Sequence, residues 1–89
     1  MCTTYILFSS HRNKYYIGQT CDELAERIRR HNSNHSGFTG KTGDWRLVYQ
    51  KKFNTKIESL YYEREIKKWK SRKRIEELIA NQCTEHPAI

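Results

Sequence analysis

The stretch TTYILFSSHRNKYYIGQ (residues 3–19) decides the fold of this chain, because it contains two apolar segments joined by a polar turn. Residues 3–9 are rich in β-branched and aromatic side chains, which is typical of a buried strand. Residues 10–14 are polar, and residues 14–19 resume the apolar pattern, so we predict a hairpin. Gly18 near the end of the second strand indicates a bulge or a close approach of the backbone to another group.

Two capping boxes predict where helices begin. Thr20, followed three residues later by Glu23, predicts a helix that begins there and ends near residue 34. Thr55, followed by Glu58, predicts a second helix that runs through Trp69. We expect Ser71 to break this helix and a last helix to cover residues 72–81.

Hydrophobic periodicity predicts a third strand over residues 45–53, with Trp45, Leu47 and Tyr49 on one side. Residues 35–44, which contain three glycines, should form a loop that could move over a substrate. The order β-β-α-β-α-α then predicts a small α+β domain with a three-stranded antiparallel sheet. Two apolar groups should face the sheet from the helices, namely Tyr62, Ile66 and Trp69, and Ile75, Leu78 and Ile79.

The bulk properties predict one basic domain. The chain has 89 residues, so we assign residues 1–82 to a single domain and residues 83–89 to a flexible tail. Recurring aromatic and aliphatic residues exclude a disordered chain. The net charge of +7, from 17 basic and 10 acidic residues, favours partners that are polyanions over a generic basic protein.

The cysteines and the N-terminus bear on the cellular compartment. Cys2, Cys21 and Cys83 are odd in number and widely spaced, which predicts free thiols in a reducing compartment rather than disulfides. The N-terminal apolar stretch is too short for a signal peptide, and no run of apolar residues could span a membrane. We therefore expect a cytoplasmic protein.

Five residues form the candidate catalytic set: Tyr5, Tyr16, Arg27, His31 and Glu63. A phenol, a guanidinium and a carboxylate on a basic domain indicate phosphodiester chemistry, because the phosphate needs a cation and an attacking water needs a group to orient it. Arg27 and His31 share a helical face because they are four residues apart. The alternatives are core aromatics for the tyrosines and a solvated helix residue for Arg27.

Two ambiguities remain at the level of the residues. Glu63 and Glu65 both border the apolar stripe of the second helix, and helical geometry alone cannot choose between them. His31 and His35 with Cys21 suggest zinc, but no further ligand has suitable spacing.

The densest basic run should contact a nucleic-acid backbone without reading its sequence, although a solvated helical face is the plainer alternative. Its members are Arg64, Lys67, Lys68, Lys70, Arg72, Lys73 and Arg74, and Arg30 extends the surface.

The order of these residues closely resembles the GIY-YIG nuclease family over about the first 80 residues. Residues 16–18 (YIG) match the second half of the signature, and residues 3–5 (TTY) stand where the family has GIY. The remaining matches are Thr20, Leu24, Arg27, His31 and Asn32, residues 45–49, residues 63–67 (EREIK) and residues 78–79. The chain is similar to short stand-alone bacterial members, which resemble the N-terminal nuclease domain of the excision-repair endonuclease.

The resemblance implies a divalent-metal-dependent endonuclease. It places the metal carboxylate, for Mg²⁺ or Mn²⁺, at Glu63 and leaves Glu65 as a surface acid. It also favours positions near the scissile phosphate for Tyr5, which would orient or deprotonate the attacking water, and for Tyr16. We expect DNA as the substrate, cut structure-selectively or non-specifically in repair or recombination, with RNA not excluded and the choice between monomer and weak dimer open. A nucleic-acid-binding module without catalysis is the alternative.

Overall fold

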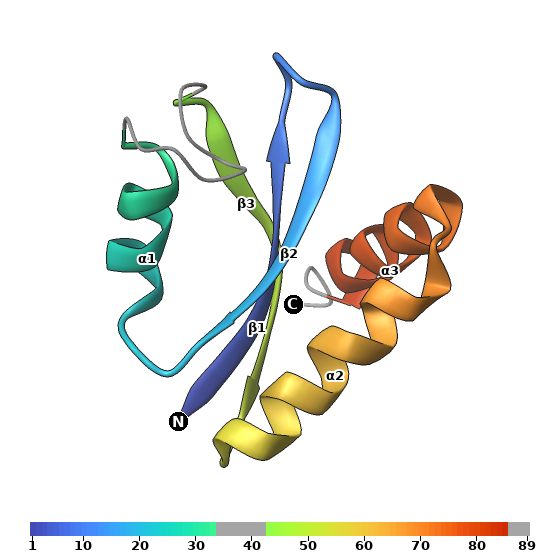
Figure 1. Cartoon of the computed structure of the whole chain (residues 1–89). Helices are drawn as coiled ribbons and strands as arrows, with labels where there is room; N and C mark the ends of the chain where they lie inside the picture. The colour runs from blue at the N-terminus through green and yellow to red at the C-terminus, as the bar shows by residue number, and fades with distance from the viewer. Residues whose placement is uncertain (34–42, 86–89) are drawn as a thin grey trace.

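The computed structural model describes residues 1–33 and 43–85, with side chains as far as residue 81. The chain forms the α+β domain that the sequence predicts, in the order β-β-α-β-α-α (Figure 1). Its elements are β1 (Cys2–Ser9), β2 (Lys14–Thr20), α1 (Leu24–His31), β3 (Trp45–Phe53), α2 (Lys56–Trp69) and α3 (Arg72–Glu85). The predicted glycine-rich loop falls largely on residues 34–42, and these lie outside the described residues, as do residues 86–89 of the predicted tail.

The three strands form one antiparallel sheet in the order β2-β1-β3. Because β1 is central, it pairs with both neighbours, and Tyr5 lies between Gly18 of β2 and Gln50 of β3. Helix α1 covers one face of the sheet, and α2 and α3 lie on the other (Figure 1). A side chain on β1 therefore belongs to one of two separate layers, and β2 forms an open edge between them.

The core is divided between the two faces because successive side chains of a strand point in opposite directions. Tyr5 and Leu7 pack with Trp45 on the α1 side, and Ile6 packs with Ile66 on the other. The predicted faces of α2 and α3 are confirmed, since the second cluster also holds Tyr62, Trp69, Ile75, Leu78 and Ile79.

The prediction that Trp45, Leu47 and Tyr49 share one side of β3 is wrong. Trp45 and Leu47 pack on the α1 side, whereas Tyr49 packs on the α2 side. The register between β1 and β3 shifts at this point, because Ile6 pairs with Tyr49 and Leu7 pairs with Leu47. The extra residue in β3 is a β-bulge, which exchanges the faces of the strand.

The two predicted capping boxes have different outcomes. Thr55 caps α2 as expected, because its hydroxyl oxygen accepts a hydrogen bond from the Glu58 amide at 3.2 Å. The first box is wrong, because Thr20 still belongs to β2 and α1 begins only at Leu24. The Thr20 hydroxyl instead accepts from the Asp22 amide at 3.0 Å, so it stabilises the turn between strand and helix.

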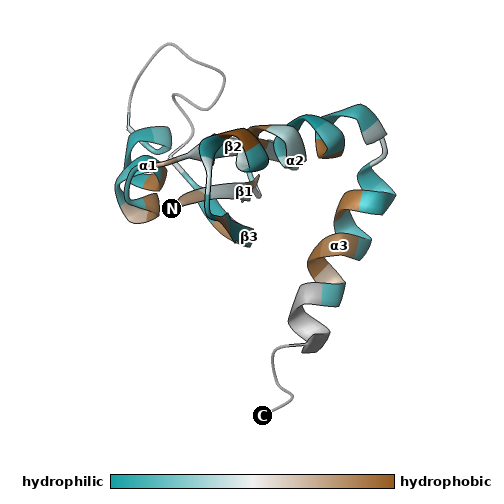
Figure 2. Cartoon of the chain, turned by 90° about the horizontal axis from the view of Figure 1, so that it is seen from below, coloured by the Kyte–Doolittle hydropathy of each residue, from teal (hydrophilic) through white to brown (hydrophobic). Residues whose placement is uncertain are grey.

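Helices α2 and α3 meet at a sharp corner, which Figure 2 shows from below. Lys70 adopts a left-handed conformation (φ 48°) and ends α2. Ser71 then accepts a hydrogen bond from the Arg74 amide at 3.3 Å, as expected of a residue that caps the next helix. Among the described residues, no helix has the length and the apolar composition that crossing a bilayer requires.

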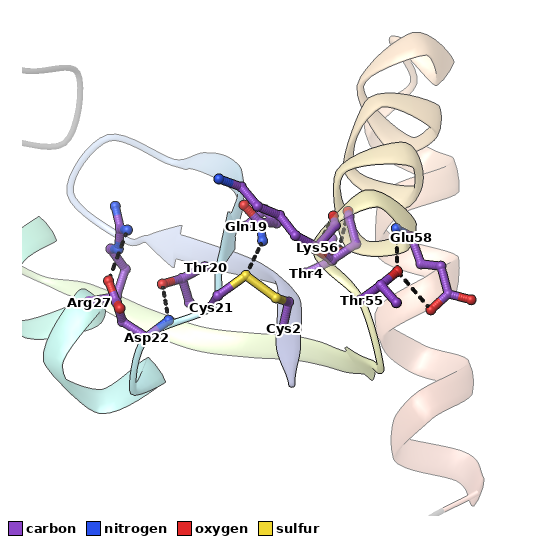
Figure 3. The surroundings of a disulfide bond; sticks show 11 residues. Cys2, Thr4, Gln19, Thr20, Cys21, Asp22, Arg27, Thr55, Lys56 and Glu58 are labelled. Atoms are coloured by element: carbon purple, nitrogen blue, oxygen red, sulfur yellow. Dashed lines mark hydrogen bonds and ion pairs between the residues drawn. A yellow bond between two sulfur atoms is a disulfide. The ribbon is translucent and has the colours of Figure 1, made fainter.

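The expectation of free thiols is wrong for Cys2 and Cys21, which form a disulfide bond (Figure 3). The residues are 19 positions apart, but β1 and β2 run antiparallel, so the start of one strand meets the residue that follows the other. The Gln19 amide also donates to Cys21 Sγ at 3.3 Å. The bond therefore links the central strand to the turn that leads into α1.

Loss of this disulfide should lower the free energy of unfolding by about 3 kcal/mol, because the unfolded chain regains the entropy of a short closed loop. The comparison is between the double variant Cys2→Ser/Cys21→Ser and the oxidised wild type, by urea denaturation. Cys83→Ser is the control and should leave the midpoint unchanged. An oxidised wild type no more stable than the double variant would contradict the prediction.

Candidate active site

The site is built around Tyr5, a buried tyrosine on the central strand. Its side chain is 1% exposed, and His31, at the end of α1, is 9% exposed. The Tyr5 hydroxyl and His31 Nε2 form a hydrogen bond of 2.8 Å. This bond joins two residues 26 positions apart and satisfies a phenol that would otherwise be buried without a partner.

Tyr16 completes an aromatic cluster with these two residues. Its ring centroid lies 4.7 Å from that of His31 and 6.5 Å from that of Tyr5. Tyr16 also contacts Trp45 edge-on, with 6.3 Å between the ring centroids. The neighbouring strands β1 and β2 and the last turn of α1 therefore bring the three predicted residues into contact.

Gly18 leaves the space that Tyr5 occupies. The two residues are opposite each other in the antiparallel pair, so their side chains would point to the same face. A Cβ atom at position 18 would lie 2.6 Å from both Cζ and Oη of Tyr5 and 2.9 Å from a ring carbon of Tyr16. The predicted close approach at this glycine is confirmed, and the group that approaches is the Tyr5 phenol.

Arg27 lies one helical turn before His31 and contributes positive charge to the site. Its guanidinium is 35% exposed and lies 3.8 Å from the carboxylate of Asp22, which is itself 76% exposed. Such a long, solvated ion pair holds Arg27 only weakly. The guanidinium is thus close enough to lower the pKa of Tyr5 and remains accessible from solvent.

The structure distinguishes Glu63 from Glu65, which the helical pattern did not. The Glu63 side chain is 14% exposed and forms an ion pair with Lys67 Nζ at 2.9 Å. The Glu65 side chain is 39% exposed and pairs with Lys68 at 3.5 Å. Glu63 also acts on the pKa of Tyr5, so its carboxylate lies within electrostatic range of the aromatic cluster.

Several effects set the charge state of Tyr5. Burial raises the pKa of its phenol well above the ordinary value near ~10, and Tyr16 adds to that effect. Arg27 lowers the pKa and Glu63 raises it, and both effects are smaller than that of burial. Tyr5 therefore remains a neutral phenol at neutral pH, and the five predicted residues all belong to one electrostatic neighbourhood.

The predicted nucleic-acid-binding residues do not form one uniform surface. Arg30 lies on α1, and the others belong to α2, α3 and the corner between them. Arg74 lies over the ring of Trp69, 4.3 Å from its centroid, and Arg72 bonds Asn13. Exposed side chains that remain for contacts with a phosphate backbone include Arg64, Lys68, Lys70 and Lys73.

The donors present bear on which metal the site could hold. In the described part of the chain, no group of three or more His, Cys, Asp and Glu side chains is placed to bind a metal ion. Cys21 is in a disulfide, and the predicted zinc partner His35 lies outside the described residues. A single carboxylate at Glu63 fits a cation such as Mg²⁺, which keeps several waters and takes further oxygens from substrate phosphate.

The sequence reasoning overlooked the role of Lys67 at the site. It was assigned to the phosphate backbone, whereas the structure pairs it with Glu63. The signal was available, because the two residues are four positions apart in a helix and have opposite charge.

The comparison with protein families agrees with this geometry. The family model described as the GIY-YIG catalytic domain matches residues 1–76. This chain therefore belongs to the GIY-YIG family, a family of nucleases whose substrates are nucleic acids. Neither the curated proteins nor the solved structures give a match.

Gly18→Ala should destabilise the fold by about 1–3 kcal/mol, because the new methyl group overlaps the Tyr5 ring. Denaturant unfolding of Gly18→Ala measures the cost. The matched control is the same substitution in a Tyr5→Ala background, where the ring that causes the overlap is gone. Equal costs in the two backgrounds would show that the Tyr5 ring does not occupy this space.

The Tyr5 phenol should stay protonated where an ordinary tyrosine ionises, near pH ~10, because burial raises its pKa. The unfolded chain loses this proton first, so the contribution of Tyr5 makes the fold less stable as the pH rises above ~10. The Cζ chemical shift of Tyr5, assigned by comparison with Tyr5→Phe, should be constant up to that pH. An ionisation of Tyr5 below about pH 9 would contradict the prediction.

Proposed function

We propose that this protein is a divalent-metal-dependent endonuclease that hydrolyses phosphodiester bonds in DNA. The observation that carries the proposal is the buried Tyr5 hydroxyl, bonded to His31 and within electrostatic range of Arg27 and Glu63. A proton-accepting pair, a cation and a carboxylate supply the functions that phosphodiester hydrolysis needs.

The protonation state of Tyr5 determines its part in the reaction. A phenol with a raised pKa is a poor base by itself. It can still orient the attacking water and relay a proton. When the water oxygen bonds to phosphorus, its proton passes to the Tyr5 oxygen, and the proton of Tyr5 passes to His31 Nε2, 2.8 Å away. We therefore assign the base role to the Tyr5–His31 pair.

Arg27 and Glu63 would act on the phosphate from opposite sides of this pair. The guanidinium of Arg27 can exchange its weak contact with Asp22 for two phosphate oxygens and hold the charge that grows there. Glu63 would hold Mg²⁺ or Mn²⁺, and Lys67 would have to release part of the carboxylate. When bound, such an ion supplies Lewis-acid stabilisation of the phosphate.

Other parts of the proposal have less specific support. The exposed cations of α2 and α3 would hold the DNA backbone, and so small a domain has little surface for reading sequence. We propose structure-selective or non-specific cleavage, in DNA repair or recombination. We also propose work in the cytoplasm as a monomer or weak dimer, where a reducing environment would keep Cys2 and Cys21 as thiols.

One observation favours a second function, that of a binding module without catalysis. Lys67 already neutralises the Glu63 carboxylate at 2.9 Å, so the charge of this carboxylate is balanced without a metal ion. Salt-sensitive DNA binding without metal-dependent turnover would support this module, and cleavage that EDTA abolishes would exclude it.

Glu63→Gln should lower DNA cleavage in Mg²⁺ at least about 100-fold, because it removes a charged group that acts on the phosphate through the metal. The assay uses nicking of supercoiled plasmid and cutting of a branched DNA. Glu65→Gln is the matched control, with the same change two residues away on the same helix, and should stay within about twofold of the wild type. EDTA should stop the wild-type reaction.

The proposal fails if folded Glu63→Gln protein cleaves as fast as the wild type. It also fails if the wild type cuts no plasmid or branched DNA with either Mg²⁺ or Mn²⁺. A branched RNA of the same sequence tests the choice of nucleic acid, because faster cleavage of the RNA would contradict a DNA nuclease.

A further inference from the structure

A pocket on the opposite side of β2 from the aromatic cluster is assigned no role by the proposed mechanism. It has a volume of about 350 Å³ and lies at the corner between α2 and α3. Tyr15, Ile17, Ile66 and Ile75 give it an apolar base, and Ile66 is fully buried. A volume of this order is within the range of pockets that bind small organic groups.

The rim of the pocket is cationic. Lys14, Lys67, Lys70 and Arg72 line it, and all four residues are exposed. Within the described part of the chain, the ammonium groups of Lys14 and Lys70 have no acidic partner. An apolar base inside a rim of positive charge complements a ligand with a flat, weakly polar body and an anionic attachment, as a nucleotide has.

The pocket also contains a rigid flat surface. The Arg72 guanidinium lies 5.1 Å from the ring centroid of Tyr15. Three contacts hold it there, because it donates to the backbone oxygen of Asn13 at 2.8 Å, to its side-chain oxygen at 2.7 Å, and to Glu76 at 3.0 Å. Nucleobases stack both on aromatic rings and on guanidinium planes, so this pair is arranged in advance for a base.

Two connections place the pocket beside the candidate active site. Tyr15 and Tyr16 are successive residues of the edge strand β2, so Tyr15 faces the pocket and Tyr16 faces the aromatic cluster. Lys67 lines the pocket and also pairs with Glu63. One nucleic-acid strand that crosses the β2 edge could present a phosphate to the cluster and a neighbouring base to the pocket.

We propose that this pocket binds the base of an unpaired nucleotide beside the phosphodiester that the protein cleaves. A base inside a duplex is stacked and paired and cannot reach the pocket, so the preferred substrates are single strands, flaps or duplexes with an extruded base. This inference rests on the proposed function and narrows its substrate class.

Binding of single-stranded DNA with and without one base tests the proposal directly. Two fluorescent oligonucleotides with the same number of phosphates are compared by anisotropy in EDTA, one fully thymidine and one with an abasic site moved along the strand. The wild type should bind the complete strand about tenfold more tightly at one position of the abasic site, as expected for loss of one stacked base.

Three variants separate the base from the phosphates. Tyr15→Leu keeps apolar bulk and should reduce the tenfold preference to about twofold, while its affinity for the abasic strand stays unchanged. Tyr61→Leu makes the same substitution on an exposed face of α2 and should keep the preference. Lys14→Gln should weaken binding of both strands equally, because it removes a cation and leaves the base of the pocket intact. Circular dichroism verifies that each variant is folded.

The outcomes distinguish the pocket from the nuclease. Equal wild-type affinity for both strands at every position overturns the pocket and leaves the proposed cleavage standing. A base preference that survives in folded Tyr15→Leu protein also overturns it. If neither strand binds even at low salt, the proposed function itself fails, and the pocket fails with it.

Discussion

The hydrogen bond between Tyr5 and His31 is the interaction on which the site depends. It fixes the last turn of α1 against the central strand, and Gly18 makes room for it on the neighbouring strand. Burial of the phenol makes the bond obligatory, because an unpaired hydroxyl there would cost free energy. The same burial raises the pKa of Tyr5, so one feature both stabilises the fold and determines which proton transfers the site can perform.

The edge strand β2 organises the rest of the functional surface. Its alternating side chains contribute Tyr16 to the aromatic cluster and Tyr15 to the cationic pocket, so two chemically different environments lie one residue apart. Lys67 connects them, because it pairs with Glu63 and lines the pocket. Occupation of the pocket by a nucleotide could therefore change the charge available at Glu63, which would couple substrate binding to assembly of the metal site.

The sequence by itself determined the features that arise from local patterns. The hairpin, the three helices and the apolar faces of α2 and α3 follow from periodicity and turn residues, because short-range sterics and burial act through neighbours in the chain. The candidate residues Tyr5, Tyr16, Arg27, His31 and Glu63 were also identified from the sequence, and the order of their motifs indicated the family that the comparison then showed.

Only the tertiary structure decided which distant groups meet. The Cys2–Cys21 disulfide and the contact of Tyr5 with His31 depend on strand register and on the placement of α1, which spacing along the chain does not encode. The bulge that moves Tyr49 to the other face of β3 had no local signal that was recognised. The difference in burial between Glu63 and Glu65 likewise appears only after α2 packs on the sheet, because two residues bordering one helical stripe are equivalent until a surface covers one of them.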